Sequence, residues 1–98
     1  MIYECLKDRT IAIIDSSKDR SDLSSEQMTK LFDIYENSGH IVKVSDVDLV
    51  SLTETELYKW CHENTEGNCF VSFLIETKGN ILAHFELEED AFAFKLRW

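Results

Sequence analysis

Two short runs of consecutive apolar residues constrain the fold of this chain most strongly. The segment Thr10–Asp15, TIAIID, is apolar at its four central positions, and CFVSFLI, residues 69–75, is apolar at six of its seven. Runs of this length are typical of strands that are covered on both faces. We therefore expect a sheet with helices packed on it.

A helical pattern follows the first of these strands. Ser24 and Gln27 have the spacing of a capping box, which predicts that a helix begins there. Gly39 is placed to end it. Between these points, apolar residues recur at helical spacing and form a stripe that we expect to face the core: Met28, Leu31, Phe32 and Tyr35.

Two more helices are predicted later in the chain. The second begins near Leu52, with Ser51 and Glu54 or Thr53 and Glu56 as its capping box, and Gly67 closes the segment. The third runs from Asp90 to about Arg97, with acids at its start and cations at its end, as the helix dipole favours. Its expected core-facing residues are Ala91, Phe94 and Trp98.

The remaining segments read as strands. Residues 2–6 and 41–44 are short and rich in apolar residues, and residues 81–88 alternate between apolar and polar after a turn signal at Thr77–Asn80. In that last strand Glu86, Glu88 and His84 are expected to face outwards. The element order β-α-β-α-β-β-α predicts an α/β fold with a mixed four- to five-stranded sheet. Its first three strands should be parallel and its final hairpin antiparallel.

Length and composition indicate one domain, residues 1–98, with 44% hydrophobic residues, enough for a single core. No apolar run reaches the length of a membrane span, and the start MIYECLKDRT lacks the pattern of a signal peptide. We therefore expect a cytoplasmic protein that does not bind a membrane.

The three cysteines, Cys5, Cys61 and Cys69, include no C-x-x-C pair, so buried thiols are the expectation. The adjacent Cys61 and His62 would point about 100° apart on a helix, which disfavours zinc. No cofactor, metal or catalytic residue is predicted from these side chains.

The charge of the chain is strongly and unevenly negative. The net charge is −9, and residues 46–98 alone carry eleven acids and four bases, or −7. An acidic surface disfavours direct binding to nucleic acid, whose backbone needs cationic partners. It is compatible with a protein that presents its charge to a basic partner.

The element order resembles that of the thioredoxin fold. A thioredoxin-like enzyme would carry C-x-x-C after the first core strand, where this chain has Asp15-Ser16-Ser17-Lys18-Asp19, and a cis-proline, where this chain has no proline at all. The resemblance therefore implies an architecture without redox activity.

The C-terminal segment GNILAHFELEEDAFAFKLRW, residues 79–98, resembles the tails of small accessory proteins of T-even-like tailed bacteriophages. The resemblance covers about a fifth of the chain and transfers no catalytic residue. It implies a phage-encoded protein that acts in the host cytoplasm by binding a host or phage protein.

These observations favour a small acidic protein that binds and modulates another protein, and no enzymatic activity is predicted for it. In its sharpest form it would mimic nucleic acid and occupy the basic groove of a nucleic-acid-binding protein. The expected binding residues are acids of the second helix and of the last strand-to-helix connection, together with one aromatic: Glu54, Glu56, Glu63, Glu66, Glu86, Glu88, Glu89, Asp90 and Tyr58.

Two alternatives remain open. A metal-dependent enzyme for phosphoryl transfer or nucleic-acid processing would use Asp15, Asp46 and Asp48, because the carboxyl ends of parallel strands gather ligands at one sheet edge. Ser16, Ser17 or Lys18 would then lie near a phosphate. A structural or assembly subunit would instead self-associate through an edge strand.

Overall fold

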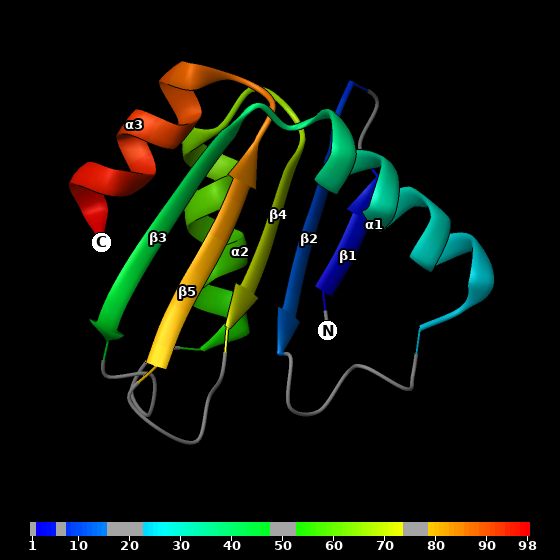
Figure 1. Ribbon diagram of the computed structural model, residues 1–98, viewed down its shortest axis with the longest axis horizontal. Helices are drawn as coiled ribbons and strands as arrows, with labels where there is room; N and C mark the ends of the chain where they lie inside the picture. Colours follow the sequence, from blue (N-terminus) through cyan, green and yellow to red (C-terminus); the bar gives the residue numbers. More distant parts are fainter. Residues whose placement is uncertain (1, 6–7, 16–22, 48–52, 74–78) are drawn as a thin grey trace.

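The computed structural model describes residues 2–5, 8–15, 23–47, 53–73 and 79–98. These residues form five strands and three helices, and they confirm the predicted α/β class and element order (Figure 1). The elements are β1 (Ile2–Cys5), β2 (Thr10–Asp15), α1 (Ser25–Asn37), β3 (His40–Val47), α2 (Glu54–Asn64), β4 (Cys69–Phe73), β5 (Gly79–Phe85) and α3 (Glu88–Arg97).

The five strands form one mixed sheet in the order β1-β2-β4-β5-β3. β2 and β4 are parallel neighbours, and β4 and β5 form the predicted antiparallel pair. β3 also pairs with β5 in antiparallel fashion, so it runs in the same direction as β2 and β4. The predicted common direction of these three strands is confirmed, but β3 lies at the far edge, separated from β2 by β4 and β5.

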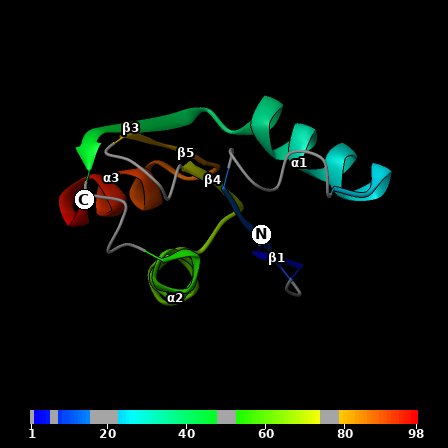
Figure 2. The same cartoon turned by 90° about the horizontal axis from the view of Figure 1, so that it is seen from below.

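One face of the sheet is covered by two helices, α2 and α3. Leu57 and Cys61 of α2 and Ala91 and Phe94 of α3 are buried against alternate residues of the strands. The Trp60 and Phe94 rings lie 5.5 Å apart and join the two helices edge to face. Figure 2 shows both helices on the same side of the sheet, with α1 on the other. The predicted core-facing residues of the last helix are thus confirmed, with Trp98 partly buried against the same core.

The opposite face is covered only in part, by α1. Leu31 packs with Ala12 and Ile14 of β2 in a second, smaller cluster of buried residues. Figure 1 shows α1 crossing one corner of this face, while β3 and much of β5 lie clear of it. On β3, Ile41 is 59% exposed and Lys43 is exposed as well. The two faces of the sheet are therefore unequally protected from water.

The first two helices begin as their sequences predict. The Ser24 hydroxyl accepts a hydrogen bond from the Gln27 backbone N–H at 3.2 Å, and the Gln27 side chain accepts one from the Ser24 N–H at the same distance. The Thr53 hydroxyl accepts from the Glu56 N–H at 3.1 Å, which selects Thr53 over Ser51 as the cap of α2. Each cap satisfies backbone donors that have no partner within the helix.

The seam between β5 and α3 differs from the prediction. β5 ends at Phe85, and α3 begins at Glu88, two residues earlier than expected. Leu87 turns toward Gly67, where an added Cβ would lie 3.0 Å from the Leu87 Cγ, so a larger residue at position 67 would have to displace the Leu87 side chain slightly. Glu88, Glu89 and Asp90 therefore all fall in the first turn of α3, where negative charge stabilises a helix.

None of the helices in the described ranges combines the length and apolar character that crossing a membrane requires.

Two of the cysteines lie in the core and the third lies on the surface. Cys61 of α2 and Cys69 of β4 are fully buried beside each other, and Cys5 at the end of β1 is exposed. The pKa of the Cys61 thiol is raised by its hydrogen bond with Cys69 and by burial. Cys61 and Cys69 are thus buried packing groups, as the sequence predicts, but the expectation of burial was wrong for Cys5, which ends an edge strand.

We predict that only Cys5 reacts when the native protein is treated with a thiol reagent at neutral pH, because alkylation requires an accessible thiolate. Mass spectrometry after a short reaction should locate one label on Cys5, and unfolding in denaturant should expose all three thiols. Labelling of Cys61 or Cys69 at the same rate as Cys5 would contradict this packing.

Candidate functional site

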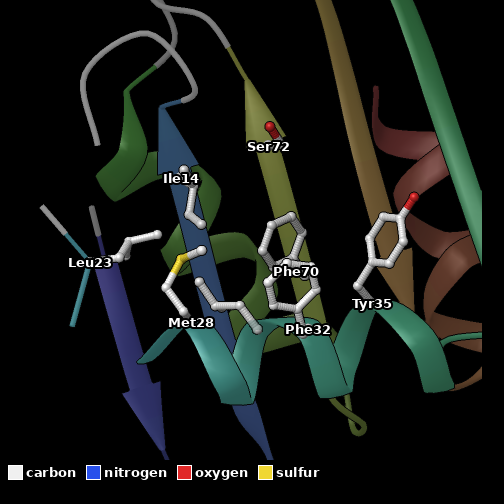
Figure 3. Close-up of a pocket in the computed structure, with 8 residues that line it drawn as sticks. Ile14, Leu23, Met28, Phe32, Tyr35, Phe70 and Ser72 are labelled. Carbon is white, nitrogen blue, oxygen red and sulfur yellow. The ribbon is translucent and has the colours of Figure 1, made fainter. Parts of the chain in front are cut away.

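An apolar groove lies between α1 and the partly covered sheet face. Its volume is about 370 Å³. Figure 3 shows side chains of α1 along one wall and side chains of β2 and β4 on the floor. The lining residues are Ile14, Leu23, Met28, Leu31, Phe32, Tyr35, Phe70 and Ser72.

The wall of the groove is the apolar stripe that the sequence assigned to the core. Leu31 is buried, as is Ile34, but Phe32 is 58% exposed and Tyr35 54% exposed, and Met28 is exposed too. The prediction that the whole stripe packs on the core was therefore wrong for three of its four members. A single helix crossing one corner of a sheet can bury only part of so wide an apolar arc.

The floor of the groove follows from strand alternation. Phe70 and Ser72 of β4 and Ile14 of β2 point to the α1 face, while their neighbours in sequence point to the core under α2 and α3. Phe70 is only partly buried. The groove thus exposes aromatic surface on both its wall and its floor.

A histidine lies buried at the side of this groove. His84 of β5 was expected to face outwards; it does point to the α1 face, but it is only 2% exposed. The Tyr35 ring lies 4.7 Å away and the Phe70 ring 5.8 Å away, centroid to centroid. Among the described residues, neither ring nitrogen has a hydrogen-bond partner. Burial therefore lowers the pKa of His84 below its ordinary value.

Many of the acids gather at one end of the sheet. The register places the starts of β2, β3 and β4 and the end of β5 at one end of the sheet, so the connections there lie together. The ends of α1 and α2 and the start of α3 meet at the same end (Figure 1). We call this region the acidic end; its exposed carboxylates are Asp8, Asp33, Glu36, Glu63, Glu66, Glu86, Glu88 and Glu89.

Asp90 does not belong to that surface, although the sequence placed it among the binding residues. It is 3% exposed, and its carboxylate accepts hydrogen bonds from the Gly67 N–H at 3.0 Å and the Glu66 N–H at 3.1 Å. These bonds tie the connection after α2 to the first turn of α3. Asp90 therefore assembles the acidic end from inside the protein.

The other predicted acids divide between the two ends of α2. Glu66 follows the end of the helix at Asn64, so it is not part of a helical charge row as predicted. Glu54 and Glu56 lie in the first turn of α2, roughly 11–14 Å along the helix from Glu63. The predicted acids therefore do not form one patch.

Tyr58, the predicted aromatic anchor, packs partly buried against the core and stacks with His62 at 5.7 Å. Its ring is thus already engaged by its own chain.

The strand order separates two of the aspartates, Asp15 and Asp46, that the hypothesis of a metal-dependent enzyme needs close together. Asp15 ends β2 and Asp46 lies on β3, with β4 and β5 between them. At about 4.8 Å per strand their backbones are roughly 14 Å apart, too far to share one Mg²⁺ ion. Asp48 lies outside the described residues, as do Ser16, Ser17 and Lys18. No three His, Cys, Asp or Glu side chains lie within reach of one metal ion in the described ranges.

Comparison of the chain with protein-family models, with curated proteins and with solved structures finds no match.

The residues that sequence reasoning missed are the exposed members of α1, Phe32 and Tyr35 above all. One signal was present in the sequence. Counting Ile34, the apolar residues of this helix span roughly 160° of its circumference, wider than the apolar stripe of about 100° with which a surface helix commonly faces its core. An apolar arc of that width indicates that a second contact, in addition to the sheet, covers part of the helix.

We predict that Asp90→Ala lowers the free energy of unfolding by about 2–3 kcal/mol, because it leaves two backbone donors without their charged acceptor. Denaturant unfolding followed by circular dichroism measures this change. The adjacent, exposed Glu89→Ala is the control and should change stability by less than about 0.5 kcal/mol. Equal effects of the two substitutions would contradict the role assigned to Asp90.

We also predict a pH dependence that originates at His84. Below about pH 6.5 the unfolded chain takes up a proton on this histidine, whereas the folded protein resists it to lower pH. The free energy of unfolding should therefore fall between pH 6.5 and 5 more steeply in the wild-type protein than in His84→Phe.

Urea unfolding of the wild type and of His84→Phe at several pH values measures that difference. Identical slopes for the wild type and His84→Phe would show that His84 titrates as it would in water.

Proposed function

We propose that this chain is a small acidic protein that binds another protein through the groove beside α1 and thereby modulates it. The observation that carries the proposal is the pair of aromatic side chains, Phe32 and Tyr35, held more than half exposed over an apolar floor. Contiguous apolar surface of this kind marks interaction sites on small proteins. Buried aromatic side chains also supply much of the binding energy in interfaces.

The charge of the chain supports a role in association. A net charge of −9 on 98 residues creates a field that steers a basic partner and raises the rate of encounter. Phage origin remains part of the proposal, supported by the resemblance of residues 79–98 to accessory proteins of T-even-like phages. In that setting the partner is a host or phage protein in the host cytoplasm, and inhibition is the mode of modulation.

The proposal is tested by capture of partners from bacterial lysate with tagged wild-type protein and with Phe32→Ser. Loss of a central aromatic contact typically costs about 2 kcal/mol, or roughly 30-fold in Kd, so the variant should lose a stoichiometric partner. Because Phe32 is exposed, its replacement should leave the thermal unfolding midpoint nearly unchanged.

The matched control is Phe92→Ser, which removes an equally exposed phenylalanine, at 63%, from α3 on the other side of the sheet. It should capture the partner as the wild type does. A partner that both variants retain, or that only Phe92→Ser loses, would contradict binding through the groove.

A second form of the proposal, the nucleic-acid mimic, is favoured by the acidic end. In this form the partner's basic groove contacts carboxylates rather than Phe32. Replacing Glu66, Glu88 and Glu89 together by glutamine, which keeps side-chain shape, should then abolish capture, and raising the salt concentration should release the partner. Capture that tolerates both the triple substitution and high salt would rule the mimic out.

A further inference from the structure

The face of the sheet that carries the groove has space for one more helix. Within the described ranges, α2 and α3 cover the strands from the other side, and α1 is the one helix on this side (Figure 2). Ala12 and Ile14 of β2 are buried on this face, so its less covered part runs from β4 to β3 and spans two strand intervals, roughly 10 Å. A helix with its side chains is about 10 Å across, so a single helix fits there.

The surface of this space is apolar at its centre. Phe32 and Tyr35 project from α1 on one side, and Phe70 lies on the floor (Figure 3). Leu82 of β5 is partly exposed on the same face, and Ile41 of β3 is 59% exposed. Apolar side chains at the i, i+3, i+4 and i+7 positions of a helix would meet these residues as ridges meet grooves.

The rim of the space along α1 carries one acid, Glu36, which is exposed and lies one turn after Phe32. The exposed Asp33 and Glu26 lie on the opposite side of α1, where Asp33 lines a separate hollow with Asn68 and Glu86. Lys30 is held elsewhere, with its Nζ 3.7 Å from the Cys5 Sγ at the other edge of α1. Lys43 of β3 is the cation on the uncovered sheet face within the described ranges. Charge complementarity along the α1 side therefore calls for lysine or arginine in the ligand.

We infer that the groove binds an amphipathic α-helix of a partner protein, with an apolar stripe flanked by basic residues on the side that meets α1. This inference rests on the proposed function and specifies the partner's element and charge. The bound helix would lie beside α1 on the face that the described residues cover only in part.

Other occupants fit this surface less well. A second copy of the chain would bring its own Glu36 against the same residue, and each copy carries a charge of −9. An added strand would pair with the backbone edge of β3 and would leave Phe32 without a partner.

The test uses synthetic helices rather than an unidentified ligand. The probe is a fluorescent Leu/Lys peptide of roughly 18 residues, long enough to form a helix, with leucine at helical spacing. Two matched peptides are a Leu/Glu version with the charge reversed and a Leu/Lys version with a central proline that breaks the helix. Binding to the full chain is measured by fluorescence anisotropy, and amide chemical shifts locate the site.

We expect 1:1 binding of the Leu/Lys peptide, at least tenfold weaker with Phe32→Ser and unchanged with Phe92→Ser. The Leu/Glu and proline peptides should bind at least tenfold more weakly. Shifts should concentrate on Phe32, Tyr35 and Leu82. Equal binding of the proline peptide, indifference to Phe32→Ser, or self-association through Phe32 without peptide binding would each overturn the inference.

A competition assay separates this inference from the proposed function. A captured partner that needs Phe32 but is not displaced by the Leu/Lys peptide would overturn the helical ligand and leave the protein-binding function standing. A peptide that binds the groove when no captured partner depends on Phe32 would overturn the function instead.

Discussion

A five-stranded sheet has two faces to shield from water, and the described part of this chain places two helices on one face and one on the other. The core under α2 and α3 is closed, with Phe73, Phe85 and Phe94 buried at its centre. The face under α1 is not closed, because α1 crosses one corner and buries chiefly Leu31 and Ile34. Exposure of Phe32, Tyr35 and Ile41 follows from this inequality. These side chains leave apolar surface in contact with water, and a partner that covers this surface would gain binding free energy from its removal from water.

The acidic side chains near the start of α3 have two different structural roles. Asp90 is buried and uses its charge to hold two backbone N–H groups, so that the connection after α2 and the start of α3 form one unit. The neighbouring Glu88 and Glu89 are exposed and stabilise the first turn of α3 through its dipole. Asn68 donates a hydrogen bond to the exposed Glu86 carboxylate at 2.6 Å, in the same region. At the acidic end, buried and partly buried polar groups thus hold the connection after α2 against the start of α3, while the exposed carboxylates face the solvent and are available to a partner.

Local chemistry allowed much of the architecture to be predicted. The Ser24–Gln27 capping box, the Thr10–Asp15 strand and the β4–β5 hairpin depend on neighbours in sequence, and the structure confirms all three. The predictions that were wrong depend on distant contacts. His84 is buried because Tyr35 and Phe70 close over it, and Asp90 is buried because Gly67 brings a connecting segment to its carboxylate. None of these three contacting residues lies within ten residues of the side chain that it buries, so no periodicity or spacing in the sequence could have indicated the contacts.

By itself the sequence determined the α/β class, the order of the elements, their caps and the acidic balance, because these follow from hydrogen bonds and side-chain periods over a few residues. Only the tertiary structure decided which strands are neighbours. Placing β3 beside β5 rather than beside β2 separates Asp15 from Asp46 and creates a sheet face wider than α1 can cover. Strand order depends on how much apolar surface the whole chain buries, and this total cannot be read from any single segment. For that reason the groove, and the function proposed for it, became visible only in three dimensions.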